Sequence, residues 1–326
     1  MDENFQTTKN IRADYLQRIN RVIDYIEAHL DENLTLETLS YIACFSKFHF
    51  HRIFQSVTGE RLSECIQRLR LEKAAALLHG NTFMTITEIG LRCGFASSAS
   101  FANSFKRHFG TSASSFKYSK QNISQKRYIC LPDEDHDKID IKIEQQKDTL
   151  TYHIRGDGYQ RSVEIVNLPP WHVAYIRYTG PYKGDTPLFA RLWNRLAAWA
   201  APHELFKNPD TVFLTLCHDD PEITMEEKLR VSVCISIDEK IQPTGDVGKI
   251  QLSGGKYAVC RFHLGAQDYP SAWGWMYGIW LPLSGFQADD RFSFERFIRQ
   301  DQQENDQKVT VDICIPVKAA KNITQS

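Results

Sequence analysis

The sequence has 326 residues, of which 42% are hydrophobic and 24% charged, and its formal net charge is −1. That length suits two or three domains, and the composition is typical of a globular protein rather than a disordered or fibrous one. No stretch approaches the ~20 apolar residues that a membrane-spanning helix needs. The polar N-terminus also lacks the apolar segment of a secretory signal, so we expect a cytoplasmic protein with no membrane partner.

The near-neutral total charge conceals an uneven distribution. Residues 1–126 carry 16 Lys and Arg against 12 Asp and Glu, whereas the rest of the chain carries 23 against 28. A basic N-terminal region is compatible with a surface that binds phosphate groups. Many solvated domains have an excess of this size, so charge alone does not predict nucleic-acid binding.

The first ~120 residues have the apolar spacing of helices. Ser46 and Thr85 are suitable N-cap residues, and Thr85 with Glu88 forms the capping-box pattern. The expected helices cover about residues 16–30, 36–43, 46–57, 62–78, 85–93 and 97–109.

An internal repeat connects these helices. Phe50, Phe54 and Gly59 recur as Phe101, Phe105 and Gly110, at an offset of 51 residues. The residues upstream recur at an offset of 50: Leu36, Leu39, Ala43 and Phe45 match Ile86, Ile89, Cys93 and Phe95. Each copy is a short helix, a tight turn and a longer helix, which is the pattern of a helix-turn-helix. Two copies joined by a helix predict a rigid tandem DNA reader.

The longer helix of each copy is the expected recognition helix. Arg, Lys and Gln hydrogen-bond base edges and phosphates, and an exposed Phe can pack on a thymine methyl. The alternative for the first helix is a solvated face with a stray Phe. The residues expected to contact DNA are Lys47, Phe48, His51, Arg52 and Gln55 in the first helix, and Ser98, Ala99, Asn103 and Lys106 in the second.

The second recognition helix has the smaller and less charged reading face. We therefore hypothesise that the first unit supplies most of the sequence discrimination and that the second mainly positions the protein. His49 and His51 lie two residues apart on a helix and so point in different directions. No metal site is expected there.

Residues 15–118 resemble the DNA-binding domain of the AraC family of transcription regulators. The stretches that carry the resemblance are LTLETLSYIACFSKFHFHRIFQSVTGERLSECIQRLRLEKAAALL and ITEIGLRCGFASSASFANSFKRHFGTSASSFK. The resemblance implies seven helices, with both recognition helices in successive major grooves about 34–36 Å apart. It also implies an asymmetric site on double-stranded DNA, bound by one chain, and activation through contact with RNA polymerase.

The same resemblance assigns base-contact positions. They fall on Phe48, His51 and Arg52 in the first helix and on Ser98, Ala99 and Asn103 in the second. Two departures concern the first turn and the second reading face. Cys44 stands where the family usually has Gly, and Ala99 and Asn103 stand where longer polar side chains are common.

Beyond residue 118 the helical period is lost. We assign the DNA-binding domain to residues 12–118 and a linker to residues 119–160, in which alternating Ile139, Ile141 and Ile143 indicate some β content. From residue 161 the elements run strand, helix, strand, strand, and then repeat the same order. Residues 161–318 are therefore predicted to form an α+β domain of two similar β-α-β-β halves, which makes the protein multidomain with an all-α first part.

All six tryptophans lie in this last domain. Aromatic-walled cavities bind flat apolar or cationic molecules, and a carboxylate such as Glu295 would favour cations. Strand alternation places Ser293 and Glu295 on one face. Core packing of the aromatics and a surface Glu295 paired with an Arg remain the alternatives. The candidate ligand-binding residues are Glu295, Tyr178, Tyr182, Trp193, Trp273, Tyr277 and Trp280.

Residues 161–318 resemble the GyrI-like small-molecule-binding domains. Matching stretches include VEIVNLPPWHVAYIRYTGPY, GGKYAVCRFH, SAWGWMYGIWLPLSGF and FSFERF. The resemblance implies two β-α-β-β modules around a ligand cleft. The family's Gly-Pro-Tyr element is present at Gly180-Pro181-Tyr182, but the second half has Leu264-Gly265-Ala266, so a cavity-lining Tyr is expected to be missing there.

The leading interpretation is a DNA-binding transcription regulator, an activator, whose last domain senses a small and hydrophobic cationic effector, as a multidrug sensor would. One alternative is a hydrolase of a reactive small molecule that uses Glu295 with Tyr178 or Tyr182, and another is a constitutive DNA binder with a protein-binding module. No nucleophile–base pair, P-loop or dinucleotide motif is present, so no enzyme activity, catalytic residue or cofactor is expected. The eight scattered cysteines indicate reduced thiols. A monomer and a homodimer both remain open.

Overall fold

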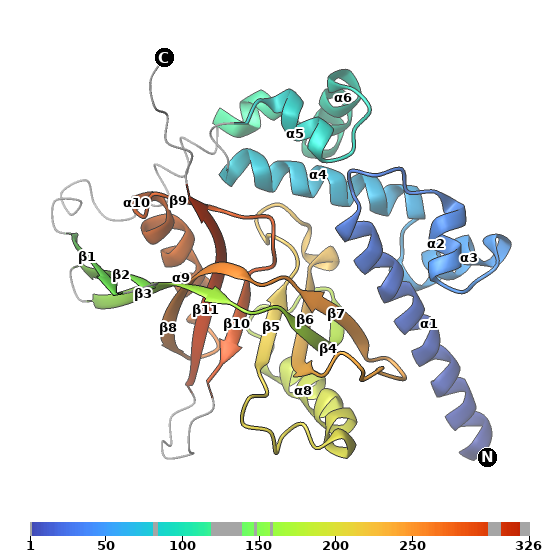
Figure 1. Cartoon of the computed structure of the whole chain (residues 1–326). Coiled ribbons are helices and arrows are strands. Elements are labelled where there is room, and N and C mark those ends of the chain that lie inside the picture. The colour runs from blue at the N-terminus through green and yellow to red at the C-terminus, as the bar shows by residue number, and fades with distance from the viewer. Residues whose placement is uncertain are drawn as a thin grey trace. The chain divides into compact units, whose positions relative to one another are not determined.

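The computed structural model describes residues 2–80, 84–118, 139–146, 149–156, 159–298 and 308–319 (Figure 1). The chain forms two compact units. The first contains residues 1–120 with 220–224 and 240–250, and the second contains the remaining residues. Among the described helices, none combines the length and the apolar character needed to cross a bilayer.

The first unit contains the predicted helices. A final helical turn at residues 113–118 completes the seven helices that the AraC resemblance implies. The labelled helices are α1 (Asp2–Ala28), α2 (Leu36–Ile42), α3 (Lys47–Thr58), α4 (Leu62–Gly80), α5 (Ile86–Arg92) and α6 (Ser98–Phe109).

The helix N-termini follow the sequence signals, with one difference. Thr85 and Glu88 form the predicted capping box: the Thr85 hydroxyl accepts from the Glu88 N–H, and Glu88 Oε2 accepts from the Thr85 N–H. Ser97 Oγ accepts a hydrogen bond from the Ser100 N–H. Ser46 occupies the N-cap position of α3, but its side chain makes no capping hydrogen bond.

Both helix-turn-helix turns pass through a left-handed residue. In the first turn that residue is Cys44, at φ +52°, and in the second it is Gly94, at φ +81°. Left-handed backbone is costly for residues other than Gly. The carbonyl of Cys44 accepts a hydrogen bond from Arg18 Nη1 at 3.1 Å, which helps to hold the first turn.

Each helix-turn-helix has its own hydrophobic core. Phe50 and Phe54 of α3 are fully buried in the first core, and Phe101 and Phe105 of α6 are buried in the second. Helix α4 contributes to both cores, because Leu69 packs in the first and residues 71–78 supply Leu and Ala to the second. This shared helix explains how the two copies are joined.

A buried ion-pair group reinforces α4. Arg68 Nη2 lies 2.8 Å from Glu60 Oε1, and Arg68 Nη1 lies 2.8 Å from Glu72 Oε2. Burial acts to lower the pKa of Arg68, but the hydrogen bond to Glu60 and the charge of Glu72 outweigh it and raise that pKa. Removing Arg68 would leave the Glu60 and Glu72 carboxylates without their cation, which is expected to destabilise the unit.

The second unit is built on an antiparallel sheet and contains all of its strands except the first part of β7, whose residues 248–250 belong to the first unit. The strand order is β1-β2-β3-β8-β11-β10-β5-β6-β4-β7, and β9 pairs with β11. The strands are β1 (Asp140–Gln146), β2 (Thr149–Gly156), β3 (Tyr159–Leu168), β4 (Trp171–Thr179), β5 (Phe213–Cys217), β6 (Arg230–Ile237), β7 (Gly248–Leu252), β8 (Gly255–Leu264), β9 (Phe286–Ala288), β10 (Phe294–Phe297) and β11 (Val309–Ala319).

The predicted pair of β-α-β-β modules is present. The first module is β4, α8 (Thr186–Ala200), β5 and β6, and it gives the order β5-β6-β4. The second is β8, a helical segment, β10 and β11, and it gives the order β10-β11-β8. The helical segment consists of α9 (Tyr269–Trp275), the π-helical η4 (Met276–Trp280) and α10 (Leu281–Leu283). The modules join where β10 pairs with β5.

Part of the expected linker belongs to this sheet. Ile141 and Ile143 lie in β1, and Ile139 immediately precedes it. β1 and β2 pair with each other, and β2 pairs with β3. β1 and β2 are therefore strands of the second unit. Residues 119–138 lie outside the described residues, and the exact domain limits stay a prediction.

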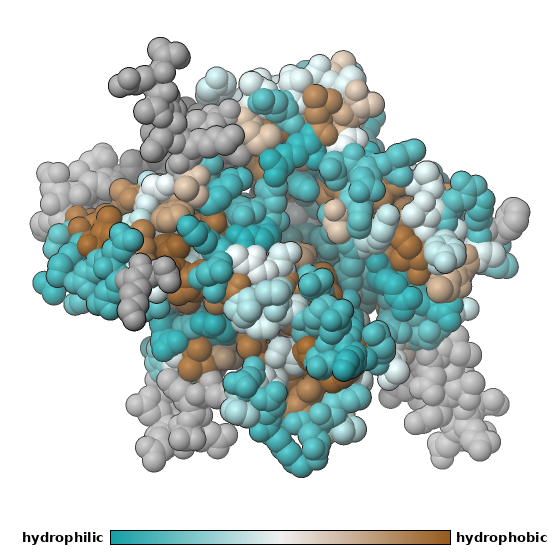
Figure 2. All heavy atoms as spheres, in the orientation of Figure 1, coloured by the Kyte–Doolittle hydropathy of each residue, from teal (hydrophilic) through white to brown (hydrophobic). Residues whose placement is uncertain are grey.

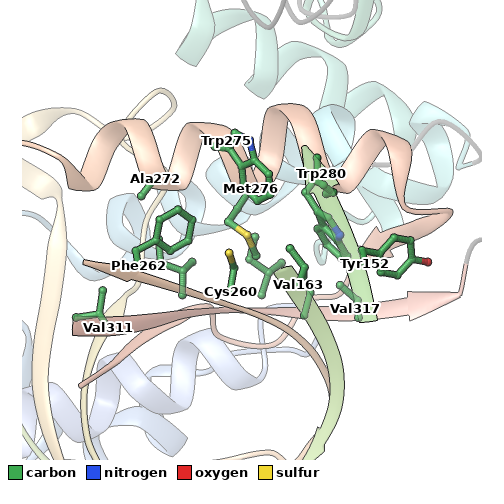
Figure 3. Close-up of a cluster of buried hydrophobic side chains, with 14 of the residues drawn as sticks. Tyr152, Val163, Cys260, Phe262, Ala272, Trp275, Met276, Trp280, Val311 and Val317 are labelled. Atoms are coloured by element: carbon green, nitrogen blue, oxygen red, sulfur yellow. The ribbon is translucent and has the colours of Figure 1, made fainter. Parts of the chain in front are cut away.

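The helices of the second module cover the core of its half of the sheet. Trp275, Met276 and Trp280 point from the helical segment toward Val163, Cys260 and other strand residues (Figure 3). Ring contacts add to this packing, as where Trp280 meets Tyr152 edge-on at 5.9 Å. Most aromatics of this half therefore serve the core, as the alternative interpretation allowed.

Candidate DNA-binding surface and the Glu295 cluster

Helix α3 exposes the side chains predicted to contact DNA. Its apolar stripe is buried, whereas the side chains on the opposite face, from Lys47, His51, Arg52 and Gln55, are exposed. The Lys47 ammonium pairs with the Glu37 carboxylate of α2 and, mainly through that hydrogen bond, lowers the pKa of Glu37. The Phe48 side chain lies outside the described residues. The other predicted contact residues on this face, His51, Arg52 and Gln55, expose their polar side chains to solvent.

Helix α6 exposes the equivalent face. Ser98, Ala99, Asn103 and Lys106 are all exposed, opposite the buried Phe101 and Phe105. Arg107 is exposed as well. It lies four residues after Asn103 and therefore on a neighbouring position of the helix surface. Arg107 was not among the predicted contact residues, because its counterpart in α3 is the uncharged Ser56.

Glu295 is buried in the middle of the sheet. It lies on β10 with 8% of its surface exposed, and its Oε1 accepts a hydrogen bond from Trp273 Nε1 at 2.8 Å. Burial raises the pKa of Glu295 to about 7, against which the Trp273 hydrogen bond acts weakly. The alternative interpretation of Glu295 as a surface glutamate paired with an Arg is therefore wrong. The neighbouring Arg296 pairs instead with Asp312 at 2.7 Å.

The pairing of β10 with β5 brings further polar groups to Glu295. Thr215 lies directly opposite it, so the two side chains share a face of the sheet. Within the described part of the chain, the buried Thr215 hydroxyl has no hydrogen-bond partner. Cys217 follows on the same face, and the charge of Glu295 adds to burial in raising the pKa of its thiol.

Tyr182 and Tyr269 approach the same carboxyl group. Burial, with smaller contributions from Cys217, Asp219 and Glu295, raises the pKa of Tyr182. Burial and the charge of Glu295 raise the pKa of Tyr269. Tyr269 comes shortly after Ala266, at the position where the sequence departs from Gly-Pro-Tyr. A tyrosine from the second half is therefore near Glu295 after all, although it is placed by a different residue.

Aromatic side chains flank Glu295 along the sheet. Trp273 stacks on Tyr277, with ring centroids 6.0 Å apart, and the Tyr277 hydroxyl lies 2.8 Å from Ser293 Oγ. Trp193 of α8 meets Phe297, two residues from Glu295, edge-on at 5.4 Å. We call Glu295, Thr215, Cys217, Tyr182 and Trp273 the Glu295 cluster.

Two predicted ligand residues lie elsewhere. Trp280 is fully buried in the hydrophobic core, against Tyr152. Tyr178 lies on β4, on the same sheet face as Glu295 but separated from it by β6 and β5. Thr215, Cys217 and Tyr269 were not predicted, because only the strand register places the first two there. No local pattern marks that register.

The described residues offer no group of three His, Cys, Asp or Glu side chains that could hold a metal ion. Seven cysteines are free thiols in the described ranges, and Cys130 lies outside them. The groups near Glu295 are hydroxyls, a thiol and aromatic rings, and the Asp219 carboxylate acts on Tyr182 and Cys217 of the same cluster. That set suits recognition of a positively charged aromatic or apolar molecule.

Comparisons with known proteins follow the same division. Residues 39–118 match the model of a helix-turn-helix domain, and residues 161–318 match that of the GyrI-like small molecule binding domain. The probable transcription factor PqrA of Proteus vulgaris is 34% identical over 101 residues, which are 30% of this chain and 82% of PqrA. The Tn10 TetD protein of Escherichia coli is 37% identical over 117 residues, covering 34% and 84% of the two chains.

Other relatives match a similar share of the chain. The HTH-type transcriptional activator AarP of Providencia stuartii is 33% identical over 101 residues, covering 31% of this chain and 74% of AarP. The chain spans only 38% of the length of the regulator YbfP of Bacillus subtilis, at 33% identity. Among solved structures, the DNA-binding domain of AdpA in complex with a target DNA is 27% identical, with a TM-score of 0.31, and covers 32% of this chain and 95% of that one.

Proposed function

We propose, from the premise that this chain belongs to the AraC family of helix-turn-helix transcription regulators, that it activates transcription in the cytoplasm in response to a small molecule. The chain is a DNA-binding regulator with a GyrI-like small-molecule-binding domain. The similarity to the transcriptional activator AarP supports activation, and contact with RNA polymerase is a further part of this proposal.

The exposed faces of α3 and α6 support the proposed DNA contacts. Both helices present polar side chains opposite buried phenylalanines, and both belong to one repeat. Arg52 has the fork of donors that binds guanine bidentately, whereas Asn103 is shorter. We retain the hypothesis that the first unit supplies most base discrimination.

Arg52→Ala is expected to weaken binding to the specific operator by about 5- to 150-fold, the loss of one bidentate base contact. Asn103→Ala should cost less and should change base preference less. The measurement is fluorescence anisotropy at fixed salt with an operator obtained by in vitro selection. Arg21→Ala, which removes an exposed charge from α1, is the control. A larger change of base preference from Asn103→Ala than from Arg52→Ala would contradict the hypothesis.

The buried carboxyl group of Glu295 indicates which class of ligand the second unit binds in this proposal. A carboxylate in apolar surroundings is unfavourable when unpaired, so a bound cation would compensate its charge. The Thr215 hydroxyl, which has no partner among the described residues, could bind a polar group of the same ligand. We therefore propose a hydrophobic cation as the effector, contacted by Glu295, Tyr182, Trp273 and Tyr277, with Trp193 at the flank.

Tetraphenylphosphonium is expected to quench the tryptophan fluorescence of the full chain saturably, because Trp273 touches Glu295. Tetraphenylborate has a similar shape and the opposite charge, and should not bind. Glu295→Gln should weaken tetraphenylphosphonium binding at least about tenfold, whereas Glu164→Gln, an exposed glutamate on β3, should not. Equal binding of both ions, or binding unaffected by Glu295→Gln, would refute a cation site at Glu295.

Sensing rather than catalysis is the function that we propose, because the similar proteins are named as regulators. A hydrolase would also use a carboxyl group of raised pKa near a tyrosine, and Glu295 with Tyr182 provides that pair. Incubating the protein with each compound that binds, followed by mass spectrometry, separates the two functions. An unchanged compound supports sensing, and conversion that Glu295→Gln abolishes supports the enzyme.

A further inference from the structure

Strand β1 forms one end of the sheet. It pairs with β2 through one edge only, and within the described ranges no strand pairs with its other edge. A free edge presents unpaired backbone N–H and C=O groups and can template pairing with another chain. Natural proteins usually prevent this pairing with charges, bulges or cover, so the side chains of β1 decide which outcome applies.

The two faces of β1 differ in character. Lys142 and Glu144 lie on one face, where Lys142 Nζ is 2.9 Å from Glu144 Oε1. Ile141 and Ile143 lie on the other face. Ile141 packs against the core of the second module, whereas 55% of Ile143 is exposed. Figure 2 shows a mostly hydrophilic face with hydrophobic residues in separate patches. Ile143 is one of few large hydrophobic residues that are exposed among the described residues.

We propose that two copies of this chain pair through the free edges of β1, as antiparallel strands related by a two-fold axis at Ile143. Each Ile143 then faces the other, and Lys142 of each copy lies opposite Glu144 of the other. The opposite charges therefore meet twice, on the same face of the joined sheet. Directly opposed residues of opposite charge stabilise antiparallel pairs, and a two-fold interface repeats each contact.

Neighbouring registers are unfavourable. An axis at Lys142 places Lys142 opposite its own copy and Asp140 opposite Glu144. An axis at Glu144 places two glutamates opposite each other. A shift of the pairing by a single residue places the isoleucines of one copy on the same face as the charged side chains of the other. The alternation of charge along β1 thus disfavours these registers. An axis at Ile141 would also oppose Asp140 to Lys142, but it pairs only residues 140–142, whereas the axis at Ile143 pairs the whole strand, Asp140–Gln146. The register at Ile143 is therefore the one favoured between two copies.

Sedimentation velocity of the full chain over a range of concentrations tests the pairing. The wild type should reach twice the chain mass of 37.6 kDa. Lys142→Glu and Glu144→Lys should each raise the dimer dissociation constant at least about tenfold, because each change converts two attractive pairs into repulsive ones. The double variant Lys142→Glu/Glu144→Lys restores opposite charges and should regain the dimer. Lys207→Glu reverses one charge of an exposed ion pair with Glu204 and should change nothing.

The register has its own test. Ile143→Cys should form a disulfide-linked dimer under mild oxidation, because directly opposed Cβ atoms lie about 4.5–5.5 Å apart and a small movement of the paired edge strands brings them to the ~3.5–4.5 Å of a disulfide. Glu144→Cys faces Lys142 and should cross-link no more than the wild type does. A wild type that stays monomeric, single reversals that leave the dimer intact, or a double variant that fails to recover it would each overturn the proposal.

Discussion

Replacing Gly94 with alanine is expected to destabilise the DNA-binding unit by about 3–5 kcal/mol. Gly94 has a φ of +81°, and a Cβ atom there would lie 2.0 Å from the carbonyl oxygen of Leu30 and 2.8 Å from Arg70 Nε. Arg70 Nε already donates to the same carbonyl at 2.8 Å. The added methyl group would therefore strain the backbone and force apart the hydrogen bond between Arg70 of α4 and the Leu30 carbonyl, which follows α1.

Gly110 provides the control. It has a similar φ of +71°, but a Cβ atom there would meet nothing within 4 Å, so Gly110→Ala should cost only the ~1–2 kcal/mol of left-handed backbone. Urea unfolding followed by circular dichroism at 222 nm measures both. All six tryptophans lie in the second unit, so their fluorescence follows that unit separately. Equal costs for the two variants would show that the turn moves away from Leu30 without penalty.

The contrast between Gly94 and Cys44 shows what the repeat could predict. Matching residues at offsets of 50 and 51 predicted both turns and the helices on either side. The left-handed backbone of each turn is also shared. The crowding at Gly94 could not be predicted, because Leu30 is 64 residues away and enters the contact only in the folded unit. A local pattern specifies conformation, whereas the space for a side chain depends on distant residues.

The sheet shows the same limit more strongly. Aromatic and β-branched runs predicted the strands of both modules, but β2, β3, β7 and β9 were not assigned. The pairing of β3 with β8, rather than with the adjacent β4, joins segments about 90 residues apart. Glu295 could be proposed from its aromatic surroundings in the sequence. Thr215 could not, because it reaches Glu295 only through the register of β5 with β10.

Glu295→Gln is expected to stabilise the ligand-free second unit by up to about 3 kcal/mol at pH 8 and by little at pH 5. The pKa of Glu295 is raised from an ordinary 4.5 to about 7 by burial. The folded state therefore holds this proton more tightly than the unfolded state does. The more favourable protonation of Glu295 in the folded state stabilises that state fully below about pH 4.5, and this stabilisation is lost as the pH rises through about 7. Glutamine carries no charge and avoids this loss.

Urea unfolding followed by tryptophan fluorescence at pH 5 and pH 8 measures the difference, and Glu164→Gln, which removes an exposed carboxyl group, should show no such dependence on pH. An equal difference in the free energy of unfolding between Glu295→Gln and wild type at both pH values would mean that Glu295 does not ionise between them.

If this difference is larger at pH 8, as expected, the ionised carboxylate destabilises the ligand-free protein at neutral pH. A cation that compensates its charge would recover that cost, so tetraphenylphosphonium should bind more tightly at pH 8 than at pH 5. The residue that destabilises the free domain would then be the one that makes it responsive.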